Sequence, residues 1–199
     1  MGIKAREGDF VETVEGLIFD VKGLVHPPHR VVAYVRYIPD EAGDRVRGNV
    51  AYRKVYPLEE RSRILDERWP IYTYFDPVLN VKLQCVSTER VKHHYKPVDR
   101  AREMLRGVGL DCLERRAVGL MEVLEEYTGL PWECFGVSGS LLVGLHTQAS
   151  DIDLVVYGTE AARQVVRALR ELLHRGECGL QRYEEDDIRR LYEARSMGS

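Results

Sequence analysis

The first half of the chain has the alternating pattern of β-strands. Apolar and polar residues alternate in "DFVETVEGLIFDVKGLV", residues 9–25, where two glycines interrupt the pattern. β-Branched and aromatic residues dominate "RVVAYVRYI", residues 30–38, and such residues favour strands. Pro27 and Pro28 lie between the two stretches and cannot continue a ladder, so we expect a loop there.

Shorter elements follow in the same half. Residues 39–49, "PDEAGDRVRGN", are polar and contain two glycines, which predicts a loop between two strands. Residues 51–56 and 71–75 predict short strands, and the second of these is the aromatic sequence "IYTYF". Residues 57–69 begin with a proline and have the charge pattern of a short surface helix.

The spacing of apolar residues becomes helical near Pro97. A helix is expected at residues 98–107, where it ends on a glycine. Asp111 can cap the next helix, and the Gly-Leu-Pro sequence at residues 129–131 stops it. Apolar residues repeat in this helix at intervals of three and four, which predicts an inward stripe of Leu113, Ala117, Leu120, Met121, Leu124 and Tyr127.

Strands and helices alternate after this point. Strands are expected at residues 133–137 and 151–158, with a short helix at 139–145 between them. The last strand leads into a helix that runs from residue 159 to about His174. Its inward residues are expected to be Ala162, Val165, Val166, Leu169 and Leu173.

The two halves together predict an α+β protein. Residues 1–100 form a β-rich N-terminal module, and residues 108–199 form a second domain in which helices pack on a sheet. Hydrophobic residues make up 44% of the chain and charged residues 31%, a balance that supports a packed core and argues against disorder. The net charge of -3 provides no global field for attracting nucleic acid.

Composition also bears on the environment of the protein. The chain has 23 Arg, 6 Lys, 2 Asn and 4 Gln, which suits a protein from a hot environment, although GC-rich coding is the alternative explanation for the arginine. The cysteines form no CxxC pair, so a zinc site is not expected, and we expect small buried thiols in a reducing compartment: Cys85, Cys112, Cys134 and Cys178. No signal peptide and no apolar stretch of membrane-spanning length is found, so a cytoplasmic protein with no membrane partner is expected.

The strongest chemical signal is a pair of aspartates in "SDIDLVVYG". Residues i and i+2 of a strand point to the same face, so Asp151 and Asp153 are expected to project together, roughly 6.5 to 7 Å apart. Two adjacent carboxylates favour a hard cation. Mg2+ fits best, with Mn2+ or Ca2+ as alternatives. A strand-edge acidic pair that only prevents aggregation is the simpler interpretation.

A Gly-Ser turn precedes the aspartates at a short distance in the sequence. Gly139 and Ser140 open a helix directly after a strand, and the free N–H groups of a helix N-terminus attract anions. Glycine allows close approach, and the Ser140 hydroxyl adds a donor to phosphate. A phosphate holder beside a metal holder is the equipment for phosphoryl or nucleotidyl transfer, so we favour a functional interpretation over the structural one.

The stretch "SGSLLVGLHTQASDIDLVV" resembles the signature of the nucleotidyltransferase superfamily that contains DNA polymerase beta and kanamycin nucleotidyltransferase. The family pattern is Gly-Gly/Ser, about ten residues, then Asp-hydrophobic-Asp/Glu-hydrophobic. Gly139, Ser140, Asp151 and Asp153 match it one for one. The resemblance covers roughly residues 110 to 175. The N-terminal stretch "EGLIFDVKGLVHPP" is also similar to uncharacterised archaeal proteins with this domain.

The resemblance implies an α/β core with a mixed sheet and flanking helices. It also implies that Asp151 and Asp153 bind Mg2+ or Mn2+, that Gly139 and Ser140 hold the phosphates of an NTP, and that an NMP group moves to a hydroxyl acceptor. The acceptor could be a nucleic acid, a protein or a small molecule, and a homo-oligomer is left open. A third carboxylate on a later strand normally completes the family's site.

The chain departs from the family in its last part. Only "CGLQRY", residues 178–183, could be a later strand, and it carries no acid. The acids that follow, residues 184–187, have the pattern of the first turn of a helix. The third ligand could be Glu184, could come from another chain, could lie on a segment beyond this sequence, or could be absent. The alternative functions are therefore a nucleotide- or metal-binding module without turnover, and a nucleic-acid-binding protein that uses its N-terminal half.

Three weaker signals have simpler explanations that we favour. His26 and His29 flank two prolines and fit a turn better than a metal site. The stretch 90–109 holds six Arg or Lys against two acids, which could follow phosphates but suits a solvated surface. The aromatic residues of "IYTYF" could stack on bases, although core packing is their commoner use.

Overall fold

The computed structural model describes residues 3–176 and 179–196. The chain packs into two compact units: one combines the residues up to Pro97 with Ser138–Asp151, and the other combines Val98–Val137 with the residues from Ile152 onward. Helices and antiparallel strands occur together, so the predicted α+β class is confirmed. The predicted division at residues 1–100 and 108–199 stays a prediction.

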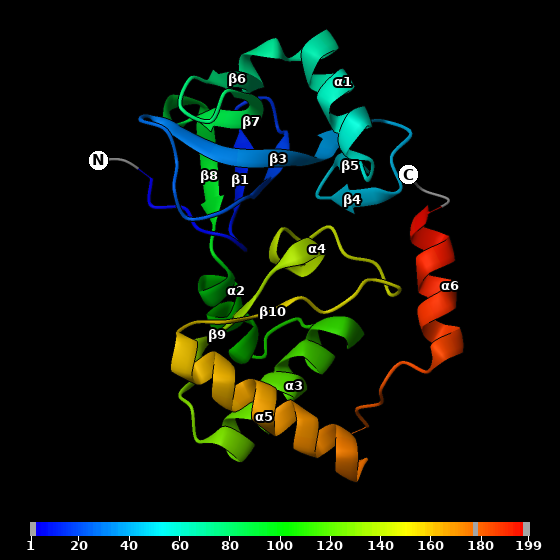
Figure 1. The fold of residues 1–199 in the computed structure, drawn as a ribbon. Helices are drawn as coiled ribbons and strands as arrows, with labels where there is room; N and C mark the ends of the chain where they lie inside the picture. Colours follow the sequence, from blue (N-terminus) through cyan, green and yellow to red (C-terminus); the bar gives the residue numbers. More distant parts are fainter. Residues whose placement is uncertain (1–2, 177–178, 197–199) are drawn as a thin grey trace. The chain divides into compact units, whose positions relative to one another are not determined.

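The first unit is built on a curled antiparallel sheet (Figure 1). Its hydrogen-bonded path runs β4-β5-β3-β2-β1-β8, and β7 pairs with both β3 and β6. The strands are β1 (Phe10–Thr13), β2 (Ile18–Val21), β3 (Arg30–Pro39), β4 (Arg45–Arg47), β5 (Val50–Lys54), β6 (Thr73–Asp76), β7 (Val81–Ser87) and β8 (Val91–Tyr95). The predicted β-rich first half is therefore confirmed.

Side chains alternate between the two faces of this sheet. Val11, Phe19 and Val35 belong to a core on one face, which α1 (Leu58–Arg68) helps to cover with Ile64 and Leu65 (Figure 1). A second cluster contains Phe10 and Ile18, which are the chain neighbours of Val11 and Phe19. Because successive side chains point to opposite faces and both faces are covered, seven of the eight positions of β1 and β2 are buried.

One predicted loop contains a strand. Residues 39–49 were expected to be a polar connection, but β4 lies within them and pairs with β5 in the register Arg47↔Val50. Gly48 has φ +59°, which suits the two-residue turn at residues 48–49 that joins the two strands. Arginines alternate with Val46 in β4, so no apolar run marks the strand in the sequence.

The second unit is largely helical. Its helices are α2 (Pro97–Leu105), which begins at the last residue of the first unit, α3 (Cys112–Thr128), α5 (Thr159–Arg175) and α6 (Glu185–Ser196). Asp111 caps α3 with a capping box that includes Glu114, and Gly129 ends the helix with φ +69°. Both ends of α3 are therefore confirmed. Short 3₁₀ helices lie at Pro70–Tyr72 and Thr88–Arg90 in the first unit and at Trp132–Cys134 in the second unit.

The buried face of α5 differs from the predicted one. Its buried residues are Ala161, Val165, Ala168 and Leu172, so only Val165 was placed correctly. Val166 is 47% exposed, and Ala162, Leu169 and Leu173 are only partly buried. Two adjacent apolar stripes run along this helix, and periodicity alone does not decide which one faces α3 and β10.

The thiols occupy different environments. Cys85 is buried, and burial raises its pKa to about 11, which makes the thiol unreactive. Cys134 is partly buried and Cys112 is exposed, so the expectation of buried thiols is wrong for Cys112. Position 112 opens α3, where a side chain can point to solvent. Cys178 lies outside the described residues.

Candidate functional site

The Gly-Ser turn follows β9 (Phe135–Val137) and the two aspartates precede β10 (Leu154–Val156). These strands form a two-stranded antiparallel ladder in which Leu154 pairs with Val137 and Val156 with Phe135. Antiparallel pairing brings the exit of β9 and the entry of β10 to one end of the ladder. All ladders among the described residues are antiparallel, whereas the family resemblance implies a mixed sheet.

The strand that was expected to carry the aspartates is shorter than predicted. β10 spans three residues instead of residues 151–158, and Asp151 and Asp153 lie in the non-strand segment before it. The ladder stops because its partner strand ends at Val137 and the chain then turns into a helix. The spacing that we derived from a strand therefore does not apply. Both aspartates are exposed residues.

Gly139 opens the short helix α4 (Gly139–Leu142) with φ +62°. This left-handed conformation favours glycine, because a Cβ there would be strained. Ser140 is only 6% exposed, so its hydroxyl lies inside the fold rather than at the surface. The neighbouring Ser138 hydroxyl donates to the Gly8 carbonyl at 2.7 Å. Gly139 is partly exposed between the buried residues Ser138 and Ser140, and the role of Ser140 toward phosphate stays a prediction.

The segment between the turn and the aspartates packs against the sheet of the first unit. Leu142, Val143 and Leu145 are buried in one cluster with Phe10 and Tyr52. Leu145 N–H donates to the Ser140 carbonyl at 2.9 Å, which closes the turn after α4. The candidate phosphate turn and Asp151 are therefore the two ends of a segment that the N-terminal sheet holds in place.

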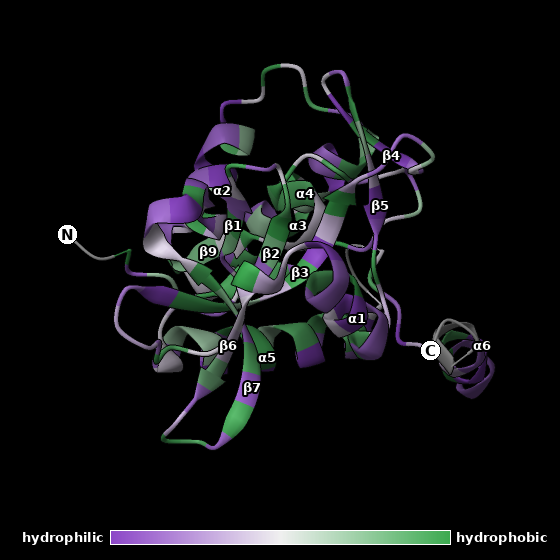
Figure 2. Ribbon diagram, turned by 90° about the horizontal axis from the view of Figure 1, so that it is seen from above, coloured by the Kyte–Doolittle hydropathy of each residue, from purple (hydrophilic) through white to green (hydrophobic). Residues whose placement is uncertain are grey.

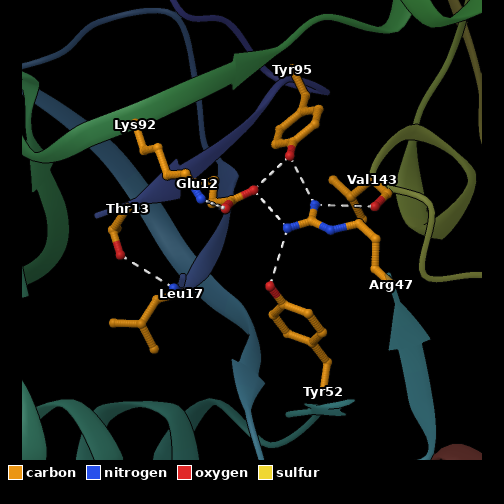
Figure 3. Close-up of polar contacts among 8 residues, drawn as sticks. All are labelled: Glu12, Thr13, Leu17, Arg47, Tyr52, Lys92, Tyr95 and Val143. Carbon is orange, nitrogen blue, oxygen red and sulfur yellow. Dashed lines mark hydrogen bonds and ion pairs between the residues drawn. The ribbon is translucent and has the colours of Figure 1, made fainter. Parts of the chain in front are cut away.

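A polar network links this segment to β1 (Figure 3). The Glu12 carboxylate is 5% exposed and accepts from Arg47 at 2.7 Å, from Lys92 at 2.9 Å and from the Tyr95 hydroxyl at 2.6 Å. Arg47 is 26% exposed and also donates to Tyr52 at 3.1 Å and to the carbonyl of Val143 at 3.3 Å. The network therefore connects the sheet to the backbone beyond α4.

The hydrogen bonds of the network stabilise the charges on Glu12 and Arg47. Burial by itself would raise the pKa of Glu12, but hydrogen bonds from Tyr95, Lys92 and Arg47 outweigh it and lower the pKa. Burial likewise opposes the charge on Arg47, yet its bond to Glu12 raises the Arg47 pKa. Burial and the bond to Glu12 both raise the pKa of Tyr95, which stays a neutral donor. Glu12 and Arg47 are thus a charged pair at neutral pH.

The lowered pKa of Glu12 predicts a specific dependence of stability on pH. A depressed carboxylate pKa stabilises the folded state above the unfolded value of 4.5, and this contribution is lost as pH falls through the folded value. The difference in unfolding free energy between wild type and Glu12→Gln should be largest above about pH 5 and should shrink below it. Urea unfolding of both proteins between pH 7 and pH 3 measures this difference, and a constant gap would contradict the prediction.

Sequence reasoning missed this network for a definable reason. Its members come from β1, β4, β5 and β8, and Arg47 lies in the predicted loop. The available signal was an acid within the apolar stretch "DFVETV", since a glutamate among core positions needs a cationic partner. The identity of that partner depends on the sheet pairing, which the sequence does not show.

The weaker signals mostly have structural roles. Both ring nitrogens of His26 are engaged, with Ala5 carbonyl at 3.0 Å and Val32 N–H at 3.2 Å, which favours the turn interpretation. In the aromatic stretch, Tyr72 is buried and packs against Phe19, whereas Phe75 is 59% exposed. Figure 2 shows hydrophobic and hydrophilic ribbon in turn along the β6–β7 hairpin, and Phe75 lies on β6.

The basic stretch at residues 90–109 is largely neutralised by acids. Arg90 pairs with Glu15 at 2.6 Å, Lys92 with Glu12, and Arg102 with Asp99 at 2.9 Å. Arg100 pairs with Glu103 and with Glu114. Four of its six cations thus have acidic partners, which favours a surface and network role over a phosphate-tracking patch.

The last part of the described chain has no strand that could carry a third carboxylate. Residues 179–184 have no strand, and α6 has Glu185, Asp186 and Asp187 in its first turn, as the charge pattern predicts. Glu184 N–H donates to Asp187 at 3.0 Å. Of the helices in residues 3–176 and 179–196, each is too short or too polar to cross a lipid bilayer.

Comparisons with known proteins provide a relative without an assigned activity. The chain is 35% identical over 178 residues to a Methanocaldococcus jannaschii protein named "Uncharacterized protein MJ1086", which covers 85% of this chain. The chain spans about half, 52%, of the length of that relative. No family profile matches the chain, and no solved structure matches it significantly. The relative is similar over most of this chain, and its name states no substrate.

Proposed function

We propose that the protein transfers a nucleotidyl group from an NTP to a hydroxyl acceptor with the help of a divalent cation. One observation carries the proposal: a left-handed Gly139 opens a helix directly after β9, while two exposed aspartates precede the antiparallel partner of that strand. The resemblance of these residues to the nucleotidyltransferase signature supports it.

The residues present fit a hard divalent cation. Asp151 and Asp153 are exposed carboxylate residues two positions apart, and Mg2+ and Mn2+ prefer carboxylate ligands together with phosphate oxygens. A bound cation would neutralise the charge that develops on the phosphates during transfer. Gly139 contributes a backbone that lets the triphosphate approach closely, because no side chain stands there.

The transfer is a substitution at phosphorus. The acceptor oxygen forms a bond to the α-phosphorus, the bond from that phosphorus to the bridging oxygen breaks, and pyrophosphate leaves with the bonding electrons. The proton of the acceptor hydroxyl passes to water. In this reaction the aspartates would bind the cation that orients the NTP, and the Gly139 turn would bind the phosphates of the NTP.

A nucleotide-binding protein without turnover is the second candidate. It is favoured by the described tail, where the acids of residues 184–187 lie at the start of α6 and not on a strand. Activation of the acceptor by a second cation, about 3.5 to 4 Å from the first, needs more anionic ligands than two. Turnover therefore separates the two candidates.

Asp151→Asn and Asp153→Asn are expected to remove the cation site. Each change removes one anionic ligand, so Mn2+ affinity should fall at least about tenfold, which equals the loss of about 1.4 kcal/mol. Pyrophosphate release from NTP and a pool of hydroxyl acceptors should fall at least about 100-fold. Calorimetry with Mn2+ and a radiolabelled NTP assay measure the two effects.

Asp186→Asn is the matched control for this test. Asp186 is also exposed but lies on α6, so its loss should leave Mn2+ affinity and pyrophosphate release unchanged. Equal Mn2+ binding by wild type and both site variants would contradict the cation site. Binding of Mn2+ and NTP by wild type without pyrophosphate release would favour the second candidate.

A further inference from the structure

The segment from Gly139 to Asp151 contains two small turns, each closed by hydrogen bonds between its own residues. Leu145 N–H donates to the Ser140 carbonyl at 2.9 Å in the first turn. In the second turn, Ser150 N–H donates to the Thr147 carbonyl at 3.0 Å, and Thr147 N–H donates to the Ser150 hydroxyl at 2.9 Å. Asp151 directly follows this second turn, so its place depends on how the two turns are joined.

Arg45 of β4 joins the two turns. Its Nη1 donates to the Leu145 carbonyl and to the Ser150 hydroxyl, each at 3.2 Å. The side chain is only 12% exposed, and its Nε pairs with Asp44 at 3.1 Å. One guanidinium group therefore contacts the end of the first turn and the residue immediately before Asp151.

The neighbouring arginine reinforces this arrangement. Arg47 is two residues further along β4, on the same face, and donates to the Val143 carbonyl. Glu12 holds Arg47 in place, and Asp44 pairs with Arg45. The planar guanidinium of Arg45 contacts Leu145 and Ser150 through Nη1 and Asp44 through Nε, a fixed arrangement that the single ammonium of lysine does not reproduce.

We infer that Arg45 is a positioning residue of the proposed site. By bridging Leu145 and Ser150 it sets the distance between the Gly139 turn, which would bind the phosphates, and Asp151, which would bind the cation. All of these residues belong to one compact unit. The inference rests on the proposed function and adds that the N-terminal sheet takes part in the site through β4.

Amide hydrogen exchange without ligand tests the structural half of the inference. Arg45→Gln should speed exchange at the amides of Thr147 and Ser150 by about tenfold or more, while amides of the β1–β2 hairpin keep their rates. Arg53→Gln is the matched control, because Arg53 lies on the paired strand β5 and contacts Asp40 and Glu60 instead. Unchanged exchange at Thr147 and Ser150 would overturn the inference.

A double-mutant cycle tests whether Arg45 acts through Asp151. Arg45→Gln should weaken binding of Mn2+ together with a non-hydrolysable NTP by about tenfold, as outer-sphere positioning residues do. In the Asp151→Asn background the same change should have little further effect, because the ligand that Arg45 positions is gone. Additive losses would mean a general structural role and would overturn the inference. If wild type binds no Mn2+–nucleotide, the proposed function fails, and the exchange rates at Thr147 and Ser150 alone decide whether Arg45 positions the turn.

Discussion

Glu12→Ala is expected to lower the free energy of unfolding by about 3 kcal/mol, because removal of one partner of a buried ion pair leaves the other charge uncompensated. The Glu12 carboxylate is buried and Arg47 is mostly buried. Among the described residues, the other groups that Arg47 contacts are two tyrosine hydroxyls and the Val143 carbonyl. Lys92 is well exposed, so its ion pair with Glu12 contributes little to the expected loss of unfolding free energy. Urea unfolding at pH 7 measures the effect.

Two comparisons make this prediction specific. Glu7 also pairs with a cation, Lys22 at 3.5 Å, but both side chains are exposed, so Glu7→Ala should cost at most about 0.5 kcal/mol. The double replacement of Glu12 by Leu and Arg47 by Met should be less destabilising than Glu12→Ala, since it leaves no unpaired charge in the core. Equal losses for Glu7→Ala and Glu12→Ala would contradict a structural role for the network.

Local signals in the sequence predicted the ends of α3 and the fold class correctly. Asp111 and Gly129 mark the ends of α3, and a cap needs only its neighbours along the chain. The choice between two apolar stripes on α5 was wrong because it depends on α3 and β10, which the helix sequence does not describe. The strand β4 was missed because arginines, not apolar residues, alternate in it.

The candidate site likewise has one part that the sequence predicts and another part that it does not. Gly139, Ser140, Asp151 and Asp153 form a short pattern that the sequence displays by itself. The contacts that hold this segment are distant in the chain: Arg45 is 100 residues from Leu145 and 105 from Ser150. No period or motif predicts such contacts, because they arise only when the sheet has folded. The length of β10 was overestimated for a related reason, since a strand ends where its partner ends.

Gly139→Val is expected to weaken NTP binding by about 100-fold or more. The triphosphate would contact the backbone at the start of α4, where hydrogen bonds to a charged group contribute about 1.5 to 3 kcal/mol each. A branched side chain at this position would occupy the space of the phosphates. It would also strain the backbone, since Gly139 has φ +62°. Equilibrium binding of a fluorescent NTP with Mn2+ measures the loss.

Gly129→Val separates the two effects of this change. Gly129 has φ +69°, and a Cβ there would meet no atom within 4 Å, so a side chain adds strain of about 1 to 2 kcal/mol without touching the turn. Both variants should therefore lose similar stability in thermal unfolding, while only Gly139→Val loses NTP. If Gly139→Val binds NTP as wild type does, the phosphates do not lie on this turn. If both variants lose NTP equally, backbone strain and not phosphate contact explains the result, because the two glycines share only their left-handed conformation.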